Sequence, residues 1–285
     1  MLRRKYPWLA GAILLLLLVA PAFAEQVELH LPGNLTAMAE FRQGDAGKPT
    51  VLLMHGFLQT HEFPTIHRLT DGLAGAGYGV LAPTLTLGVT HRRQSLACEA
   101  IHTHTMGDAT REIAAWVDWL KARKLTRIVL VGHSFGSVET LAFLSSRRNA
   151  PIRKLIGVSV VEGRLKIDER ALDKLIGKTR ALAQAGNKSL ITEQFSFCQK
   201  FRATPEALLS YIEWSPERIL AEVARLEIPT TFIMGSRDDR LGANWIQRLH
   251  HTRAGIRVIE GANHFMDGDF EFDLLDSVLL ELKAP

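Results

Sequence analysis

Long hydrophobic runs are scarce in this sequence. Residues 9–19 form the one extended apolar stretch, and no later segment approaches the roughly 20 apolar residues that a membrane-spanning helix needs. Repeats, low-complexity tracts and long runs of charge are also lacking. These absences exclude a polytopic membrane protein and a repeat array, and we expect residues 25–285 to form one domain.

A strong charge imbalance is lacking as well. The formal net charge is +4, but Arg3, Arg4 and Lys5 all lie within the first 24 residues, which contain no acidic residue. The rest of the chain carries 31 basic and 30 acidic side chains. A nearly neutral protein has no electrostatic reason to bind nucleic acid or an acidic surface, so we expect neither as a partner.

The first 24 residues match the pattern of a secretory signal peptide. A basic start is followed by apolar residues 9–19, by Pro21, and by small residues at Ala22 and Ala24. This pattern predicts cleavage before Glu25 and a soluble mature protein, without a membrane span, in the periplasm or outside the cell. The alternative is an uncleaved membrane anchor, for which the apolar stretch is short.

Cysteine is rare, since the chain contains only Cys98 and Cys198. In an oxidising compartment the two could form a disulfide that closes a loop of about a hundred residues. Otherwise they would be two separate buried thiols. The sequence leaves both arrangements open.

Apolar segments of strand length alternate with segments of helical periodicity. Ile113, Trp116, Val117 and Leu120 recur at helical spacing, for example. Strands that alternate with crossover helices predict a mostly parallel sheet with helices on both faces. The first two strands could pair as a hairpin. The predicted strands are 27–31, 37–41, 50–54, 78–82, 127–131, 154–161, 229–234 and 256–259, and the predicted helices are 64–75, 108–124, 138–144, 244–251 and 269–282.

The alternation stops between the strand that ends near Val161 and the strand that begins near Pro229. We interpret the intervening segment, at about residues 163–226, as a helical cap with few strands. Residues that favour helix starts support this interpretation. They occur near Asp168, Thr204 and Ser215.

The most informative motif is Gly132-His133-Ser134-Phe135-Gly136, which lies between a predicted strand and a predicted helix. In that context Gly-x-Ser-x-Gly indicates a sharp turn that raises a serine hydroxyl above the edge of the sheet. Glycine suits both positions because a Cβ would clash in so tight a turn. A serine that only caps the following helix is the alternative.

Four motifs, in this order, resemble those of the α/β-hydrolase superfamily. They are His55-Gly56-Phe57, the Gly-x-Ser-x-Gly motif, Gly235-Ser236-Arg237-Asp238 and Gly261-Ala262-Asn263-His264-Phe265. The resemblance covers nearly all of residues 27–283. It implies an α/β-hydrolase fold, with a mostly parallel, doubly wound sheet and an active site at the carboxyl ends of the strands. The sequence departs from the superfamily pattern after Pro83, where an acidic residue and glycines are usual.

The resemblance implies a catalytic triad of Ser134 as nucleophile, His264 as base and Asp238 as the acid that orients the base. Their order along the chain is also that of the superfamily. Asp239, beside Asp238, and Glu162, at the end of an earlier strand, are alternative acids, and the spacing of the motif favours Asp238.

The resemblance also implies an oxyanion hole made by the backbone amides of Phe57 and Phe135. Their neighbours His55 and His133 are interpreted as structural residues. Two weaker features lie elsewhere. His102-Thr103-His104 lacks a partner cluster at metal-ligand spacing and is interpreted as a polar loop. The pair Arg92-Arg93, and also Arg237, could contact an anionic substrate, but isolated arginines are usually solvated.

These residues predict a secreted serine hydrolase that cleaves an acyl bond, first of all a carboxylic ester, through an acyl-enzyme. Its partner would be a small-molecule acyl substrate, and no metal or organic cofactor is implied. Serine at the nucleophile position disfavours the epoxide hydrolases and haloalkane dehalogenases of the superfamily. An acyltransferase, an amidase or a peptidase would use the same triad. A non-catalytic binding protein is disfavoured by the intact motif order, and the oligomeric state is left open.

Overall fold

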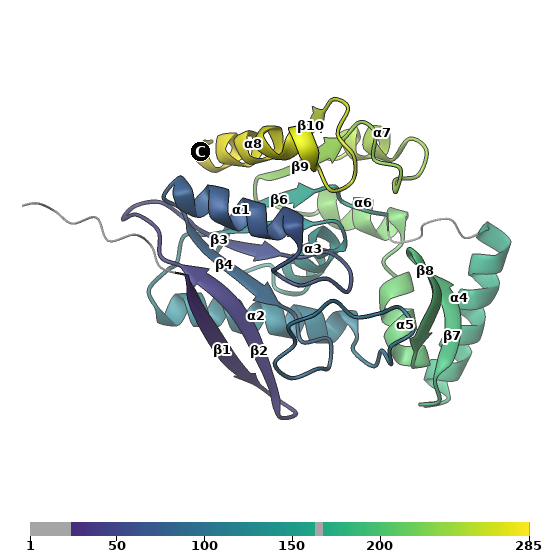
Figure 1. Ribbon diagram of the computed structural model, residues 1–285. Coiled ribbons are helices and arrows are strands. Elements are labelled where there is room, and N and C mark those ends of the chain that lie inside the picture. Colours follow the sequence, from purple (N-terminus) through teal and green to yellow (C-terminus); the bar gives the residue numbers. More distant parts are fainter. Residues whose placement is uncertain (1–23, 163–167, 285) are drawn as a thin grey trace, which may run out of the picture.

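An eight-stranded sheet with helices on both faces dominates the computed structural model, which describes residues 24–162 and 168–284 (Figure 1). Its strands are β1 (Glu25–Leu31), β2 (Leu35–Arg42), β3 (Thr50–Met54), β4 (Gly79–Thr84), β5 (Ile128–His133), β6 (Ile152–Val158), β9 (Thr230–Gly235) and β10 (Gly255–Ile259). They lie in the order β1-β2-β4-β3-β5-β6-β9-β10. β2 pairs antiparallel with β1 and β4, whereas all other neighbours pair in parallel. The predicted hairpin and the mostly parallel sheet are confirmed.

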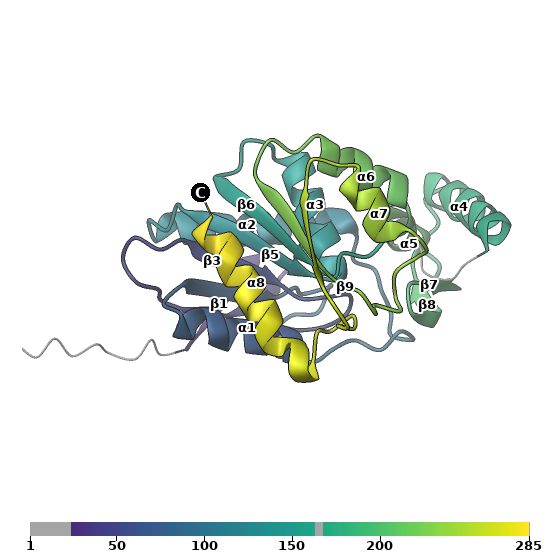
Figure 2. The same ribbon diagram turned by 90° about the horizontal axis from the view of Figure 1, so that it is seen from above.

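Alternate residues of the central strands enter two different apolar cores. In β3, Leu52 and Met54 belong to one core, and Val51 and Leu53 belong to the other. Strands buried on both faces are typical of parallel sheets covered by crossover helices. One face is covered by α1 (Pro64–Gly75) and α8 (Glu271–Lys283), which follows the short helix η1 (Gly268–Phe270), and the other by α2 (Met106–Ala122), α3 (Phe135–Ser146), α6 (Pro216–Ala224) and α7 (Trp245–His250) (Figure 2).

Helix α2 begins two residues before its predicted start, and a capping box explains the difference. The Thr105 hydroxyl accepts a hydrogen bond from the Asp108 backbone N–H at 3.1 Å. In return the Asp108 carboxylate accepts one from the Thr105 N–H at 2.8 Å. This reciprocal pair satisfies donors that would otherwise lack partners at the helix start.

The insertion between β6 and β9 combines helices with a second small sheet. It contains α4 (Glu169–Gln184), β7 (Ile191–Phe195), β8 (Cys198–Ala203) and α5 (Pro205–Ile212), and it is followed by α6. The three predicted helix starts are confirmed, because Asp168, Thr204 and Ser215 are N-caps whose side chains accept backbone hydrogen bonds. α6 packs against α3 and so belongs to the helical layer beside the sheet.

The insertion is richer in helix than in strand, as predicted, but the antiparallel hairpin of β7 and β8 was not foreseen. Phe195 pairs with Cys198 across a two-residue turn, Ser196–Phe197, in which Ser196 has φ 53°. Such turns are usually marked by glycine or asparagine, and neither occurs here. The hairpin therefore lacked the local signal from which it could have been predicted.

Two predictions fall on residues outside the described part of the chain. The signal peptide, predicted at residues 1–24, coincides with residues 1–23, and the predicted start of the cap coincides with residues 163–167. Within the described ranges, no helix combines the length and apolar character that crossing a bilayer requires.

A disulfide joins Cys98, in the long loop after β4, to Cys198 at the start of β8. It decides between the two arrangements that the sequence left open. Backbone hydrogen bonds reinforce the same contact, since the His102 N–H donates to the Arg202 carbonyl and the Thr204 N–H donates to the His102 carbonyl. The hairpin is thereby fastened to the sheet domain.

Replacing both Cys98 and Cys198 with alanine should lower the free energy of unfolding. The bridge spans a sequence separation of 100 residues, for which the loss of loop-closure entropy predicts at most about 4–5 kcal/mol. Urea denaturation of the oxidised wild type and the double variant measures the difference. An unchanged free energy of unfolding would contradict a stabilising role for the bridge.

Candidate active site

Ser134 stands at a sharp turn between β5 and α3. Its backbone has φ 55° and ψ −124°, a conformation that is uncommon for a residue other than glycine and that costs on the order of 1–3 kcal/mol. The flanking glycines make the turn possible. A Cβ at Gly132 would lie 2.6 Å from the Gly136 carbonyl oxygen, and one at Gly136 would lie 2.3 Å from the His55 carbonyl oxygen.

Ser134, His264 and Asp238 form one continuous chain of hydrogen bonds. Ser134 Oγ lies 2.8 Å from His264 Nε2, and His264 Nδ1 lies 2.8 Å from Asp238 Oδ2. The side chains of His264 and Asp238 are 2% and 0% exposed. The second carboxylate oxygen, Oδ1, accepts the Arg240 backbone N–H at 3.0 Å, so both oxygens of Asp238 are engaged.

The topology of the sheet explains this convergence. Ser134 follows β5, Asp238 follows β9 and His264 follows β10, and all three strands run in parallel. Their carboxyl ends therefore meet at the same edge, where side chains from distant parts of the sequence come together. The hydroxyl, the imidazole and the carboxylate can there pass a proton from the serine to the histidine.

Neither alternative acid is hydrogen-bonded to His264. Asp239 is exposed and lines the pocket beside His264. Glu162 packs against Gly242, and burial raises the pKa of its carboxyl. Asp238 is thus the carboxylate that contacts the imidazole, as the motif spacing predicted.

The backbone amides of Phe57 and Phe135 lie next to the chain of hydrogen bonds that begins at Ser134. Phe135 directly follows Ser134, and the rings of Phe57 and Phe135 contact each other edge to face, with centroids 5.5 Å apart. Among the residues that the structure describes, no group accepts a hydrogen bond from either amide. Two free N–H donors beside a nucleophile can bind an oxygen that becomes negatively charged.

Arg92 holds the loop that carries Phe57, a role that the sequence did not indicate. Its side chain is buried, and it donates to the carbonyls of Gln59 at 2.6 Å and Leu85 at 2.6 Å. It also donates to the carbonyl of Gln94. The expectation of a solvated arginine at position 92 is therefore wrong. Its partners are up to 37 residues away in sequence, so no local pattern could have revealed them.

His55 and His133 are buried and act as supports, as predicted. His55 Nε2 accepts the Leu85 N–H at 3.0 Å, which leaves Nδ1 to donate to the Gly56 carbonyl at 2.8 Å. His133 Nε2 lies 3.1 Å from the His264 carbonyl oxygen. Burial lowers the pKa of each imidazole to about 3, so both rings are neutral at physiological pH.

His102 and His104 are packing residues inside the protein, so their interpretation as a polar loop is corrected. The His102 ring stacks on Phe201 at a centroid distance of 4.3 Å, and His104 Nδ1 lies 2.7 Å from the Tyr211 hydroxyl. Burial lowers the pKa of His104 to about 3. The β7–β8 hairpin and α5 cover these two rings, and the sequence alone does not predict that contact.

One group of described residues, Glu40, His61 and Glu62, has side-chain atoms that could share a metal ion, all within 4.8 Å of one another. Its members already have protein partners. Arg42 pairs with Glu40 at 2.6 Å, and the Thr84 hydroxyl lies 2.6 Å from His61 Nδ1. We interpret the group as an ion-pair network that fastens the loop after β3 to β2 and β4.

A pocket of about 550 Å³ opens beside His264, under the tip of the β7–β8 hairpin. Its lining is mostly polar, and Phe197 and Phe265 contribute the aromatic part. The space between the hairpin and the sheet is filled instead by packed aromatic rings. Those rings belong to Phe57, Phe135, Phe195, Phe201 and Tyr211.

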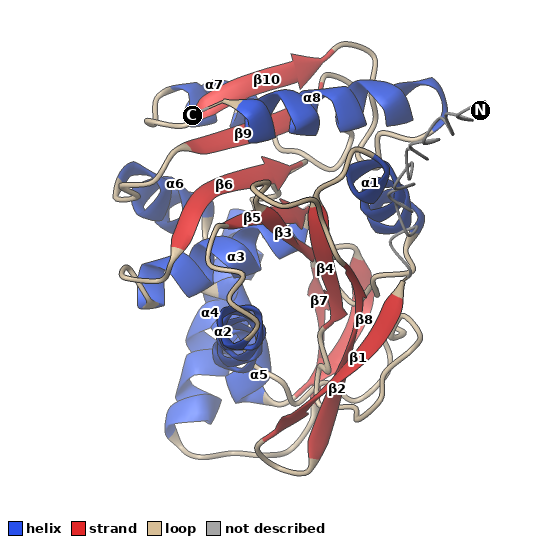
Figure 3. Cartoon of the chain, turned by 90° about the vertical axis from the view of Figure 1, so that its left-hand side faces the viewer, coloured by secondary structure: helices blue, strands red, loops and turns tan. Residues whose placement is uncertain are grey.

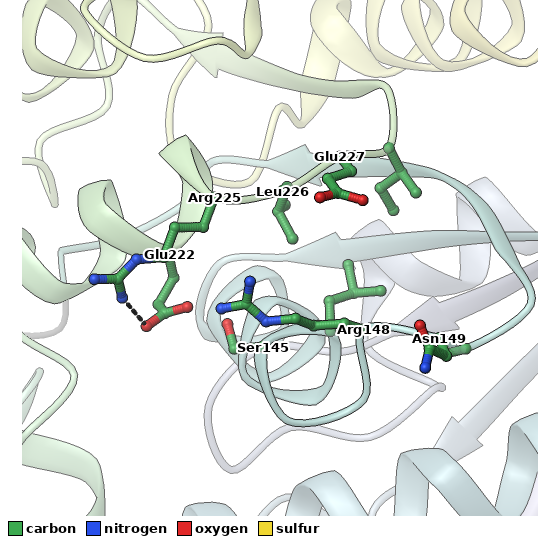
Figure 4. A pocket seen from close by; sticks show the side chains of 10 residues that line it. Ser145, Arg148, Asn149, Glu222, Arg225, Leu226 and Glu227 are labelled. Atoms are coloured by element: carbon green, nitrogen blue, oxygen red, sulfur yellow. Dashed lines mark hydrogen bonds and ion pairs between the residues drawn. The ribbon is translucent and has the colours of Figure 1, made fainter.

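A separate pocket of about 220 Å³, shown in Figure 4, lies between the last turn of α3 and the end of α6. It is remote from Ser134, because α3 has 12 residues and rises about 1.5 Å per residue. The Ser145 hydroxyl donates to the Leu141 carbonyl of its own helix, and Glu222 pairs with Arg225 at 3.0 Å. Among the described residues that line this pocket there is no histidine, and the Ser145 hydroxyl is engaged within its own helix.

Two buried carboxyl groups, Glu112 on α2 and Glu139 on α3, lie near Arg92. Burial raises the pKa of Glu139 to about 8 and that of Glu112 to about 7, and the Arg92 charge opposes both shifts. Glu112 accepts hydrogen bonds from Thr86, whereas Glu139 Oε2 has no partner within residues 24–162 and 168–284.

We expect the contribution of Glu139 to the free energy of unfolding to fall as the pH rises from about 5 to about 8. In this window the unfolded chain has lost the Glu139 proton, since a free glutamate has a pKa of about 4.3, while the folded protein keeps it. Stability falls with pH wherever the folded state binds more protons. Glu139→Gln imitates the neutral carboxyl. The free energy of unfolding of the variant, relative to that of the wild type, should therefore be higher at pH 8 than at pH 5. Urea denaturation of both proteins at the two pH values measures the difference. Free energies of unfolding that depend equally on pH would contradict this expectation.

Comparisons with known proteins agree with this fold. A sequence profile of the alpha/beta hydrolase family matches residues 51–271. A search among curated proteins finds no match to the sequence.

Several solved structures are similar. A monoacylglycerol lipase from Paleococcus ferrophilus is 16% identical, with a TM-score of 0.63 over 91% of this chain and 98% of that chain. Est1E from Butyrivibrio proteoclasticus is 17% identical, with a TM-score of 0.61 over 92% and 99%. Alpha/beta hydrolase domain-containing protein 10 from mouse is 16% identical, with a TM-score of 0.62 over 91% and 98%. At such identities the similarity concerns the fold alone.

Proposed function

Because the chain belongs to the alpha/beta hydrolase family, we propose that it is a serine hydrolase that cleaves carboxylic esters with Ser134 as nucleophile. The observation that carries the proposal is the hydrogen-bonded chain from Ser134 through His264 to Asp238, with 2.8 Å at each link. The family includes other chemistries, but a serine at this turn with a histidine in contact suits acyl transfer to the hydroxyl.

The first half of the reaction forms an acyl-enzyme. Ser134 Oγ attacks the ester carbonyl while His264 Nε2 takes its proton, and Asp238 holds the imidazole with Nδ1–H toward Oδ2. The carbonyl oxygen becomes negative and binds the amides of Phe57 and Phe135, each of which contributes about 3–4 kcal/mol. His264 then protonates the leaving alcohol. In the second half, water attacks the acyl-enzyme while His264 takes its proton. His264 then returns the proton to Ser134 Oγ as the carboxylic acid leaves.

We also propose that the protein is exported to an oxidising compartment, the periplasm or the exterior of the cell. The N-terminal pattern supports export, and the Cys98–Cys198 disulfide supports an oxidising environment, where such bonds persist. Fractionation of cells that express the full chain, compared with a chain lacking residues 1–24, tests the proposal. Equal recovery of both forms in the cytoplasm would overturn it.

Hydrolysis of p-nitrophenyl esters of graded acyl length tests the proposed activity. The wild type should release p-nitrophenol from at least one ester with saturation kinetics. Adding methanol as a competing acceptor distinguishes hydrolysis from transfer, because an acyltransferase would form mainly the methyl ester. A folded wild-type protein that is inactive on the whole series would contradict the proposal.

A further inference from the structure

The open pocket beside His264 carries an excess of positive charge on its wall. Arg237 and Arg240 both line it, and Asp239 is the one acidic residue among its lining side chains. Neither guanidinium lies within ion-pair distance of a carboxylate in the described ranges, and the masked segments contain no acidic residue. Within residues 24–162 and 168–284, both charges therefore line the pocket without an ion-pair partner.

Arg240 is held in place by aromatic rings. Its guanidinium carbon lies 4.7 Å from the centroid of Phe265 and 5.5 Å from that of Phe197. Contact with a ring uses the flat face of the guanidinium, so the N–H donors along its edge remain available to a carboxylate. The rings also limit the motion of the side chain, which lowers the entropy that binding would cost.

The position of Arg240 relative to the reacting atoms is set by its own backbone. Its N–H donates to Asp238 Oδ1 at 3.0 Å, so the residue that would bind a substrate charge lies two positions from the acid that orients His264. Phe265, one of its ring contacts, directly follows His264. A group bound at Arg240 would thus lie in the same pocket as the base.

Little apolar space is open beside the proposed nucleophile. The rings of Phe57, Phe135, Phe195, Phe201 and Tyr211 occupy the region under the hairpin and are all at least 95% buried. A long hydrocarbon chain would have to displace them. A short, polar substrate can instead use the pocket that is already present, where Gln194 and Asn263 add further polar groups.

We infer that the site prefers esters that carry a carboxylate, which binds to Arg240 with the help of Arg237 while the ester carbonyl meets Ser134. This inference rests on the proposed esterase function and names a substrate class for it. Arg240 is the specificity-determining residue, and Arg237, which is exposed, adds to the local positive potential.

The test compares two esters with the same adipoyl chain, 4-nitrophenyl hydrogen adipate, which is anionic, and methyl 4-nitrophenyl adipate, which is neutral. The measured quantity is the ratio of their kcat/KM values after subtraction of spontaneous hydrolysis. We expect the wild type to favour the anionic ester by about fivefold to tenfold, the range of one charge-assisted contact that is partly open to water. The preference should weaken as added salt shortens the screening length from about 10 Å at 0.1 M to about 3 Å at 1 M.

Arg240→Gln should bring this ratio close to one while keeping the backbone N–H that Asp238 needs, and the double variant with Arg237→Gln should abolish the preference. Arg248→Gln is the matched control, because Arg248 lies on α7 and pairs with Glu217. If the wild type hydrolyses both esters without a preference, or with a preference that Arg240→Gln leaves unchanged, the inference is overturned while the proposed function stands. A folded wild type that hydrolyses neither ester would overturn the proposed function, and the inference with it.

Discussion

Replacing Ser134 with alanine is expected to lower kcat for ester hydrolysis by about 10⁴-fold to 10⁶-fold. The variant keeps the turn, the free amides of Phe57 and Phe135 and the His264–Asp238 contact, but it has no atom that can form the acyl bond. Any residual rate would come from water bound in a site that still stabilises the oxyanion. Steady-state kinetics with the best p-nitrophenyl ester, together with circular dichroism to confirm folding, measures the effect.

Ser145→Ala is the matched control for this experiment. Ser145 is also on α3, but its hydroxyl donates to the Leu141 carbonyl and lies at the opposite end of the helix. We expect its kcat to stay close to that of the wild type. If Ser134→Ala retained wild-type activity, or if Ser145→Ala lost as much, the assignment of the nucleophile would be wrong.

Asp238→Asn is expected to lower kcat by about 10⁴-fold, although the shape of the side chain hardly changes. The carboxylate accepts the Nδ1–H of His264, so Nε2 presents a lone pair to Ser134. An asparagine that donates its amide toward Nδ1 would favour the other tautomer, in which Nε2 carries the proton and cannot accept one. The loss should therefore appear in kcat, with little change in KM.

Glu162→Gln and Asp239→Asn separate the three candidate acids. Neither carboxylate is hydrogen-bonded to His264, since Glu162 packs against Gly242 and Asp238 occupies the position beside Nδ1. On a neutral ester both variants should lose far less activity than Asp238→Asn. A large loss of activity in Glu162→Gln, with a small loss in Asp238→Asn, would assign the role of the acid to Glu162 instead.

The candidate site was predictable where sequence motifs coincide with the ends of strands. Ser134 lies in a motif whose glycines are required by close backbone contacts, and Asp238 and His264 lie in short loops after parallel strands. Parallel pairing brings such loops to one edge of the sheet whatever the detailed packing. The helix starts at Thr204 and Ser215 were predictable for a related reason, because an N-cap acts within its own first turn.

The features that escaped prediction depend on contacts between distant segments. Arg92 is buried because the loop after β4 folds against the loop after β3, and His102 is buried because the hairpin packs on it. In sequence, both segments look polar. The β7–β8 hairpin lacked a turn signal and is held by a disulfide whose partner is 100 residues away. Local patterns carry no information about such neighbours.

Labelling with a fluorophosphonate probe, followed by peptide mapping, shows whether Ser134 is activated, because the probe reacts with serine hydroxyls that a neighbouring base has activated. We expect one adduct in the folded wild type, located on Ser134, and its loss in His264→Ala. A folded wild-type protein that acquires no adduct, or acquires it on a different serine, would contradict the claim that Ser134 is an activated nucleophile.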